Sequence, residues 1–402
     1  GDQLNLLTPI FRGATNCWEA SHFVLDPDYL LAVTDLCGCI QDFGTHPFHN
    51  VIRKFAQTEI KAPLVLGNLA GHFFSEIIGA SQEGAATFDE SLRQFRRENG
   101  MDMCALNDFG NAGEAGWYQE AHNQFDHIND TVHGPLVNAP HSMHIDQTMV
   151  ESEFICESMG LQGRMDCLYW VANENSAVTL ELKSGKERWM GGPRAEHSAQ
   201  VALYSDVLFY NLGVRRDSAQ NLLFYSRTNQ LYGDPATTCR IRELIQLRNR
   251  MVFNDHRLKN GEAQELIDTI NVIDLIPEGH PLMPFEQPRI EGVLEPIRNA
   301  DPLAKDYFYR FLQFVMVEHF LSKTGDDKLG ATQGFSKTWN ASLDDKLRSG
   351  DILIDLGVRE FQGTRGIEKI VFTLPDDTSD FESIANFREG DSILVYARNS
   401  NS

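Results

Sequence analysis

The chain has 402 residues, of which 42% are hydrophobic and 23% are charged, and its formal net charge is −22 at pH 7. A chain of this length can form two domains, or one large domain with an appendage. No segment approaches the roughly 20 apolar residues that span a bilayer, and no secretory leader is visible, so we expect no membrane partner. Seven irregularly spaced cysteines argue against a disulfide framework and favour the reducing cytoplasm.

The acidic balance weighs against nucleic acid as a partner, because phosphate binding needs a positive field. Net charge is an average over the whole chain, however, and a local groove can be basic within an acidic shell. Several basic residues do lie close together in the sequence: Arg164, Lys183, Lys186, Arg188 and Arg194. The charge therefore weakens the prediction of a nucleic-acid partner without excluding it.

Helical and strand patterns alternate over the first two thirds of the chain. Residues 110–148 have weak periodicity, and we expect loops between short helices there. Histidines in "THPFHN" and "HSMHID" are expected to lie in solvated loops. The clearer patterns predict amphipathic helices over 67–79, 88–100, 196–213 and 237–255, and strands over 167–172, 177–183 and 221–226.

The last third changes character. Residues 275–298 carry five of the 15 prolines and predict a connector, and a long amphipathic helix is expected at 301–325. Short strand patterns separated by turn residues follow and predict a small β-barrel or sandwich. We therefore expect three parts: a main domain over 1–274, a helical connector over 275–330, and a barrel over 331–402 with strands at 351–358, 369–375 and 391–398.

Three charged residues lie on the predicted strand pair: Asp166, Glu181 and Lys183. Side chains alternate along a strand, so Glu181 and Lys183 share one face while Leu182 points to the other. Two carboxylates on neighbouring strands can hold Mg²⁺ or Mn²⁺, and the backbone carbonyl of Leu182 would point to the same place. Lys183 can hold an attacking water or offset charge on a phosphate. Because E-x-K is common by chance, an ordinary surface hairpin remains the alternative.

Further residues follow in order around this triplet. Gly163 precedes Asp166 by three positions, and Gln200 and Tyr204 lie one helical turn apart. The series G-x-x-D, E-x-K, Q-x-x-x-Y resembles the RecB-type branch of the PD-(D/E)XK nuclease superfamily, with Met165 in place of the proline. The blocks "GLQGRMDCLYW", "LELKSGK", "EHSAQVALY", "LLFYSRT", "RELIQLRNRMV", "YFYRFLQFVMVEHFLSKTG" and "FREGDSILVYAR" are together similar to the nuclease region and following β-barrel of replication and repair nuclease–helicases.

This resemblance implies a restriction-endonuclease-like α/β core, with a mixed central sheet flanked by helices, over residues 1–274. It implies Mg²⁺- or Mn²⁺-dependent hydrolysis of phosphodiester bonds, on single-stranded DNA ends or flaps. Gln200 and Tyr204 would support the catalytic site, and His72 and Glu153 are further candidate metal ligands. The basic residues expected to contact DNA are Arg164, Lys186, Arg188 and Arg194.

Two features depart from the family pattern. Relatives often hold a four-cysteine iron–sulfur cluster with three cysteines downstream of the core, but only Cys239 follows Tyr204, so we expect no cluster. Cys37 and Cys39 are then ordinary, partly buried cysteines. The family also places a histidine on the helix after a G-N or G-T pair, where this chain has Gly71, with His72 one position later. A shift of one residue rotates a helical side chain by about 100°.

Two other functions stay open. One is a nuclease fold with weak or lost catalysis that guides a DNA strand to a helicase motor. The other is a restriction or CRISPR-associated nuclease of the same superfamily, which the barrel and the 301–325 helix disfavour. No G-x-x-x-x-G-K-[ST] sequence occurs, so a helicase motor is expected to lie beyond residue 402 or on a separate subunit.

Overall fold

The computed structural model describes residues 3–57, 60–79, 86–106, 109, 113–138, 141–188, 191–234, 241–325, 334–362, 369–375, 387–388, 393 and 395. The chain divides into two compact units, residues 1–317 and residues 318–402. The three-part division expected from the sequence stays a prediction. None of the described helices has a stretch long and apolar enough to cross a bilayer.

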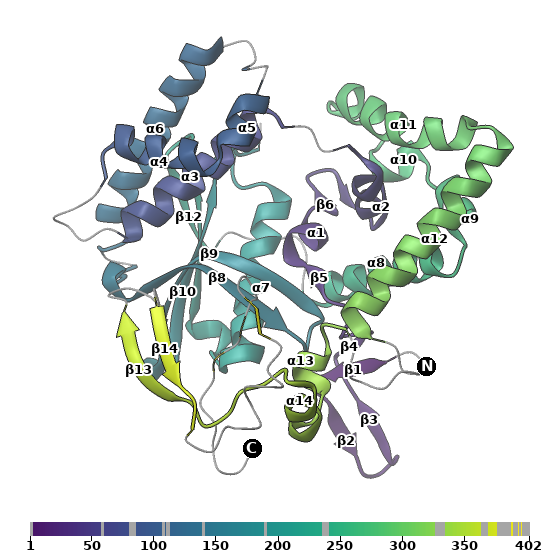
Figure 1. The fold of residues 1–402 in the computed structure, drawn as a ribbon. Helices are drawn as coiled ribbons and strands as arrows, with labels where there is room; N and C mark the ends of the chain where they lie inside the picture. The colour runs from purple at the N-terminus through teal and green to yellow at the C-terminus, as the bar shows by residue number, and fades with distance from the viewer. Residues whose placement is uncertain are drawn as a thin grey trace. The chain divides into compact units, whose positions relative to one another are not determined.

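The first unit is built on a mixed six-stranded sheet (Figure 1). Its strands are β5 (Leu31–Ala32), β8 (Thr148–Cys156), β9 (Leu161–Val171), β10 (Ser176–Lys183), β11 (Ala219–Tyr225) and β12 (Gln230–Gly233), in the order β12-β11-β10-β9-β5 with β8 paired to β9. β10 runs antiparallel to β9 and parallel to β11. Helices flank this sheet, so the predicted α/β class with a mixed central sheet is confirmed.

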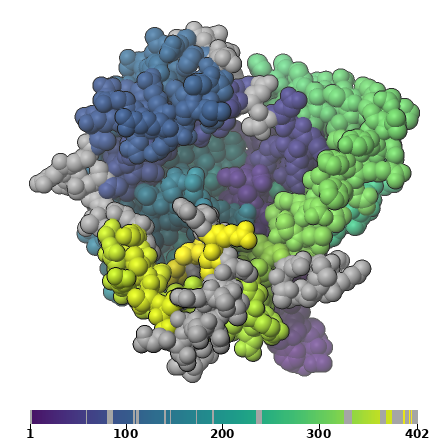
Figure 2. Space-filling view, in the orientation of Figure 1, coloured from purple at the N-terminus to yellow at the C-terminus, as the bar shows by residue number. Residues whose placement is uncertain are grey.

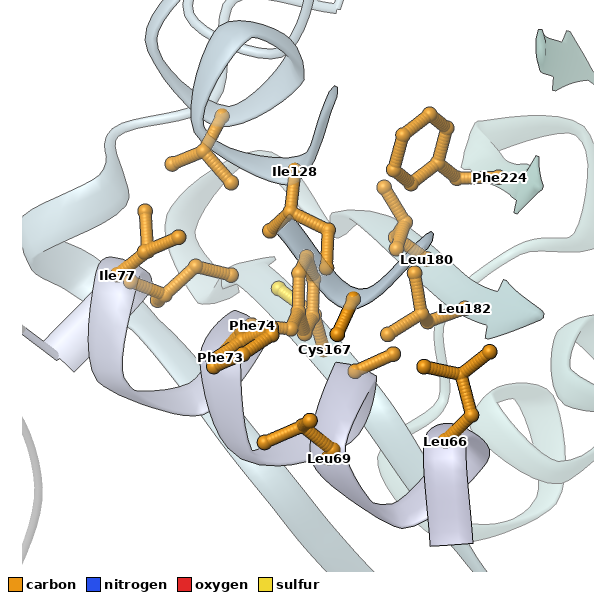
Figure 3. Close-up of a cluster of buried hydrophobic side chains, with 14 of the residues drawn as sticks. Leu66, Leu69, Phe73, Phe74, Ile77, Ile128, Cys167, Leu180, Leu182 and Phe224 are labelled. Carbon is orange, nitrogen blue, oxygen red and sulfur yellow. The ribbon is translucent and has the colours of Figure 1, made fainter. Parts of the chain in front are cut away.

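One face of the sheet is covered by α3 (Ala62–Gly79), with α4 (Phe88–Glu98), α5 (Gly100–Ala105) and α6 (Gly113–His133) around it. Apolar side chains of α3 and α6 pack against alternate residues of β9, β10 and β11. Figure 3 labels ten members of this core: Leu66, Leu69, Phe73, Phe74, Ile77, Ile128, Cys167, Leu180, Leu182 and Phe224.

Helix α6 contradicts the expectation of loops between 110 and 148. It buries a narrow stripe at Trp117, Ala121, Gln124 and Ile128, spaced three or four residues apart. Such spacing is typical of a helix that rests on a core. Because polar Gln124 is one member of the stripe and most of the intervening residues are polar, the apolar periodicity was too weak to indicate a helix of this length.

The opposite face of the sheet is covered by α7 (Ala195–Leu212), which confirms the helix predicted at 196–213 and contacts β11 and β10. The short helices α1 (Val33–Cys37) and α2 (Phe48–Phe55) and the long α8 (Ile241–Lys259) belong to the same unit. His49 lies within α2 and is 3% exposed, so the solvated loop expected for it was wrong. Burial of Val51 and Ile52 draws this turn of helix into the core.

Helix α8 carries a fully buried guanidinium. Arg248 is 0% exposed and donates hydrogen bonds to the backbone carbonyls of Asp26 and Tyr29, at 2.8 and 2.9 Å, and to that of Leu25. Its Nε also donates to the carbonyl of Gly160 at 3.4 Å. Gly160 has a φ of +62°, and a Cβ there would lie 2.4 Å from the guanidinium. Arg248 therefore joins α8 to the segment before β5 and to the turn before β9.

The rest of the first unit consists of small hairpins and a helical layer. Side chains of this layer are seen at the surface in green in Figure 2. Phe285 and Tyr307 of the layer are 74% and 69% exposed. The hairpin strands are β1 (Leu4–Leu7) with β4 (His22–Leu25), β2 (Ile10–Arg12) with β3 (Cys17–Glu19), and β6 (Ile40–Gln41) with β7 (Gly44–Thr45). The helices are α9 (Ala263–Asp268), α10 (Val272–Leu275), α11 (Met283–Asn299) and the part of α12 (Pro302–Thr324) that ends at Val317.

The second unit begins within α12 and continues with α13 (Lys337–Asn340) and α14 (Leu343–Ser349). Its strands β13 (Gly357–Gln362) and β14 (Lys369–Thr373) form an antiparallel pair, which confirms the strand predicted at 369–375. The strand predicted at 351–358 begins only at Gly357. The strand predicted at 391–398 lies outside the described residues, apart from Ile393 and Val395. No closed barrel forms among the residues of this unit that the structure describes.

Candidate active site

Strands β9 and β10 place Asp166 and Glu181 side by side. Leu180 pairs with Cys167 in this antiparallel ladder, so Glu181 is opposite Asp166. Directly opposite residues in such a ladder have Cβ atoms about 5 Å apart and point to the same face. The backbone N–H of Leu182 donates to Oδ2 of Asp166 at 2.7 Å. The structure thus brings together the two carboxylates that the sequence singled out.

Glu181 is 3% exposed, and its carboxylate is surrounded by three hydrogen-bond donors. Lys183 Nζ and Gln200 Nε2 each donate to Oε1 at 2.7 Å. The Tyr204 hydroxyl donates to Oε2, also at 2.7 Å. Lys183 and Gln200 are joined as well, since Lys183 Nζ donates to Gln200 Oε1 at 3.0 Å. A buried charge is tolerated when it is paired and hydrogen-bonded, and this network meets both conditions.

Helix α7 supplies Gln200 and Tyr204 from one face, since the two are four residues apart. Gln200 Nε2 donates to the Tyr204 hydroxyl at 2.9 Å. The Tyr204 ring packs edge-on against Phe154 of β8, with ring centroids 6.1 Å apart. A Cβ at Gly163 would lie 2.9 Å from the Phe154 ring. The glycine three residues before Asp166 therefore leaves room for the aromatic ring that backs Tyr204.

The network carries more negative charge than Lys183 neutralises. Burial, with the nearby Glu181 carboxylate, raises the pKa of Asp166 to about 8, although Lys183 opposes the shift. Burial tends to lower the pKa of Lys183, but Glu181 and Asp166 outweigh it, so the pKa is raised and the amine stays charged. A second cation would offset the free-energy cost of ionising Asp166 in this buried site.

A cavity of about 700 Å³ lies where α3, β8, β9, β10 and α7 meet. Asp166 and Lys183 line it from the sheet, and His197 and Arg194 line it from the start of α7. The remaining walls come mainly from α3 and the edge of the sheet, and include Gly67, Asn68, Gly71, His72, Ser75, Glu151, Arg164, Leu182, Ser184 and Gly185. The cavity is therefore large enough to admit part of a substrate beside the carboxylates.

Glu151 is a cavity residue that the sequence did not indicate. The ladder pairs Val150 with Cys167 and Ser152 with Met165, so Glu151 is opposite Asp166 on the other side from Glu181. Its φ is +54°, a conformation that regular strands do not contain. Its Oε2 forms an ion pair with Nε of Arg164 at 2.5 Å. Alternation along a regular strand does not anticipate such a kink, and no other signal distinguished Glu151 from Glu153.

The other predicted site residues fall into two groups. His72 lines the cavity together with Gly71, with its Nε2 3.4 Å from Glu76 and its Nδ1 3.8 Å from Glu98. The one-residue shift has not removed this histidine from the cavity. Arg164 and Arg194 also line it. Outside the lining residues are Glu153, which is exposed on β8, Lys186, which is exposed, and Arg188, whose Nε lies 2.9 Å from Asp42.

The donor atoms of the site suit a hard divalent cation. Asp166 and Glu181 offer carboxylate oxygens, which Mg²⁺ and Mn²⁺ prefer, and a cation would favour the ionised form of Asp166, whose pKa is raised by burial and by Glu181. Both oxygens of Glu181 already accept protein hydrogen bonds. Among the residues that the structure describes, no three His, Cys, Asp or Glu side chains are arranged to hold a metal ion. Cys37 and Cys39 are buried, and Cys239 lies outside the described ranges.

The fold and site define an α/β protein with a candidate hydrolytic centre, and part of the chain is similar to known helicase/nucleases. The DNA replication ATP-dependent helicase/nuclease DNA2 of Bos taurus is 31% identical over 147 residues, which cover 34% of this chain and 13% of the relative. The protein of the same name from Homo sapiens is 31% identical, over 32% of this chain and 12% of its own length. The one from Gallus gallus is 33% identical, over 27% of this chain and 11% of its own length. The chain thus matches 11 to 13% of the length of these relatives. No family model matches.

Proposed function

We propose that the chain is a metal-dependent deoxyribonuclease of the PD-(D/E)XK type that hydrolyses phosphodiester bonds in single-stranded DNA ends or flaps. The observation that carries this proposal is the network around Glu181, in which Lys183, Gln200 and Tyr204 hold one carboxylate next to Asp166 at a cavity. Similarity to proteins named helicase/nuclease supports the same reaction.

Each residue of the network has a role in this reaction. Asp166, Glu181 and the carbonyl of Leu182 would hold Mg²⁺ or Mn²⁺, a type of ion that lowers the pKa of bound water and stabilises charge on a phosphate. Lys183 carries a positive charge at the cavity and can orient a water or balance the developing charge. Gln200 and Tyr204 fix the orientation of Glu181. Arg164 and Arg194 offer guanidinium groups to strand phosphates.

We further propose that the chain works as the nuclease part of a larger nuclease–helicase. The relatives carry both activities in their name, and this chain matches only a small part of their length. The motor would belong to the same longer chain or to a separate subunit. The 402 residues should then cleave DNA without ATP, at a rate that ATP does not change.

A cleavage assay on a labelled single strand in Mg²⁺ or Mn²⁺ tests the proposed function. Asp166→Asn, Glu181→Gln and Lys183→Met should each lower the rate by about 100-fold or more. The first two remove a carboxylate that would hold the metal ion, and the third removes the positive charge that would balance charge on the phosphate. Glu174→Gln is a matched control, since Glu174 is exposed in the connection between β9 and β10. A triplet variant that cleaves as fast as this control would remove its residue from the catalytic assignment.

A second function is favoured by one observation. Both oxygens of Glu181 are occupied by protein donors, as they would be in a site kept for structure alone. The chain would then be a catalytically weak DNA-binding module that guides a strand to a motor. In that case the chain would bind single strands but leave them uncut in either metal, and Asp166→Asn would bind them equally well.

A further inference from the structure

The ion pair between Glu151 and Arg164 closes one side of the cavity. Arg164 Nε lies 2.5 Å from Glu151 Oε2, and both side chains line the cavity with Asp166. The pair is open to solvent on the Arg164 side, since the Arg164 side chain is 58% exposed, whereas Oε2 of Glu151 is buried and contacts Arg164 as an ion pair without a hydrogen bond. An incoming anion can therefore reach this guanidinium.

The position of Glu151 depends on the kink in β8. Its backbone has a φ of +54°, and its ladder position is opposite Asp166, with Glu181 on the far side of Asp166. Three neighbouring strands thus each carry one acidic residue at this level of the sheet. Arg164 is the cation paired with the first of them, as Lys183 is with the third.

A phosphate oxygen and a carboxylate oxygen compete for the same donor. Both bind a guanidinium through charge-assisted hydrogen bonds with similar geometry. Arg194 differs from Arg164 at this cavity, because its carboxylate neighbour Glu196 is more distant, at 3.7 Å. Lys183 is engaged by Glu181 and Gln200. Arg164 is thus the cavity cation that pairs closely with a carboxylate outside the Glu181 network.

We propose that Glu151 is a positioning residue that holds Arg164 at the cavity. When a single-stranded nucleic acid binds, one of its phosphates takes the place of the Glu151 carboxylate as the partner of Arg164. The carboxylate orders the guanidinium beside Asp166 and at the same time competes with the substrate for it. Strands that place a phosphate at this point bind by exchange of one anion for another. This inference rests on the proposed function, from which it takes its ligand, a single-stranded nucleic acid. It adds that Glu151 controls access of the strand to the same site.

A double-mutant cycle tests this exchange through binding alone. The affinity of the full 402-residue chain for a fluorescein-labelled 20-nucleotide oligo(dT) is measured by anisotropy in EDTA, where no metal supports cleavage. Arg164→Gln should weaken binding about 10-fold and lower the log–log salt slope by about 0.7, the value for one phosphate contact on a single strand. Glu151→Gln should tighten binding about 5-fold, since the competitor for Arg164 is gone.

The double variant decides between exchange and plain repulsion. If Glu151 acts through Arg164, the double variant should bind as Arg164→Gln does, within about twofold. If Glu151→Gln tightens binding equally with and without Arg164, the carboxylate merely repels the strand, and the proposal is overturned. Unchanged binding by Arg164→Gln would overturn it as well. Glu174→Gln, which removes the same charge from an exposed position between β9 and β10, should bind like the wild type.

Folding and catalysis are separated from this result. Circular dichroism melting of each variant shows whether it folds, and the conservative glutamine at 151 keeps the size of the side chain. A chain that shows the expected cycle but cuts no DNA in Mg²⁺ or Mn²⁺ would retain the Glu151–Arg164 exchange and lose the proposed nuclease function. A chain that cuts DNA but does not show the expected cycle would retain the proposed nuclease function and lose the Glu151–Arg164 exchange.

Discussion

Tyr204 shows how much of the site depends on a single hydroxyl group. The side chain is 1% exposed, and its hydroxyl donates to Glu181 at 2.7 Å, accepts from Gln200 at 2.9 Å and lies 3.2 Å from the carbonyl oxygen of Arg164. Burial next to Glu181 raises the pKa of this hydroxyl, so it remains a donor. Without it, one oxygen of a buried carboxylate has no partner in the network.

We therefore expect Tyr204→Phe to lower the free energy of unfolding by about 1–3 kcal/mol, the cost of a buried polar group that loses its partner. Urea titration followed by circular dichroism measures this change. Tyr307→Phe is the matched control, because Tyr307 is 69% exposed, and it should change stability by less than about 0.5 kcal/mol. A Tyr204→Phe variant as stable as that control would show that the hydroxyl does not support Glu181.

The buried His49 should make the free energy of unfolding depend on pH. Burial lowers its pKa to about 4, helped by nearby Arg289, whereas the unfolded chain has a histidine pKa of about 6.5. As the pH falls below 6.5, only the unfolded state takes up this proton, so stability is lost until about pH 4. His49→Gln should lose about 2 kcal/mol less than the wild type between pH 7 and pH 5.

Unfolding free energies from urea titration at the two pH values measure this difference. His122→Gln serves as the control, because the His122 side chain is 49% exposed, and it should lose as much stability as the wild type. An equal loss in His49→Gln and the wild type would mean that His49 is not the buried neutral group that causes the effect.

The residues of the site differ in how far the sequence could indicate them. Asp166, Glu181 and Lys183 follow from strand alternation, and the structure brings them together as expected. Gln200 follows from helical spacing on α7. Glu151 could not be found this way, because its place at the cavity depends on a backbone kink that the sequence of β8 does not predict. Its role, like the roles of the others, stays a prediction.

At the level of elements, one buried charged side chain of α8 contacts two other parts of the first unit. The buried guanidinium of Arg248 reaches carbonyls before β5 and before β9. Arg248→Met should leave these carbonyls without donors and destabilise the chain by about 3–5 kcal/mol. Arg250→Met is the matched control, because Arg250 is exposed two residues later on the same helix. Thermal and urea unfolding measure both variants, and equal stability of the two would contradict the structural role of Arg248.

Helices and strands were predicted correctly where apolar residues occupy one face of the element and polar residues the other. Helices α7 and α12 and strands β10, β11 and β14 have clear apolar patterns, and they lie where the sequence placed them. Helix α6 was missed because its buried stripe includes Gln124. The burial of Arg248 could not be predicted either, since an arginine in an amphipathic helix normally faces water. Three of its partners, the carbonyls of Leu25, Asp26 and Tyr29, lie more than 200 residues away in the sequence.

At the level of the whole molecule, an acidic protein holds several carboxylates around one cavity. With a net charge of −22, the chain should gain stability from a divalent cation bound at Asp166 and Glu181. Mn²⁺ at 100 times its dissociation constant would add about 2.7 kcal/mol to the free energy of unfolding. We expect the melting temperature in Mn²⁺ to exceed that in EDTA by a few degrees.

Differential scanning calorimetry of three proteins measures this stabilisation without any substrate. Asp166→Asn should lose most of the Mn²⁺ shift. Glu153→Gln should keep it if Glu153, which is exposed on β8, is not a ligand, so the same experiment tests that candidate. A shift of equal size in Asp166→Asn would place the cation elsewhere.

The sequence separation of the Arg248 contacts also bears on the order in which the molecule forms during synthesis. Strands β8 to β11 and helix α7 come from one continuous stretch, residues 148–225, so the network around Glu181 needs only short loops to close. The segment at residues 25–29 must wait for Arg248, more than 200 residues later. A nascent chain released from the ribosome before α8 should therefore contain the assembled carboxylates and lysine, with an N-terminal segment that proteases still cut.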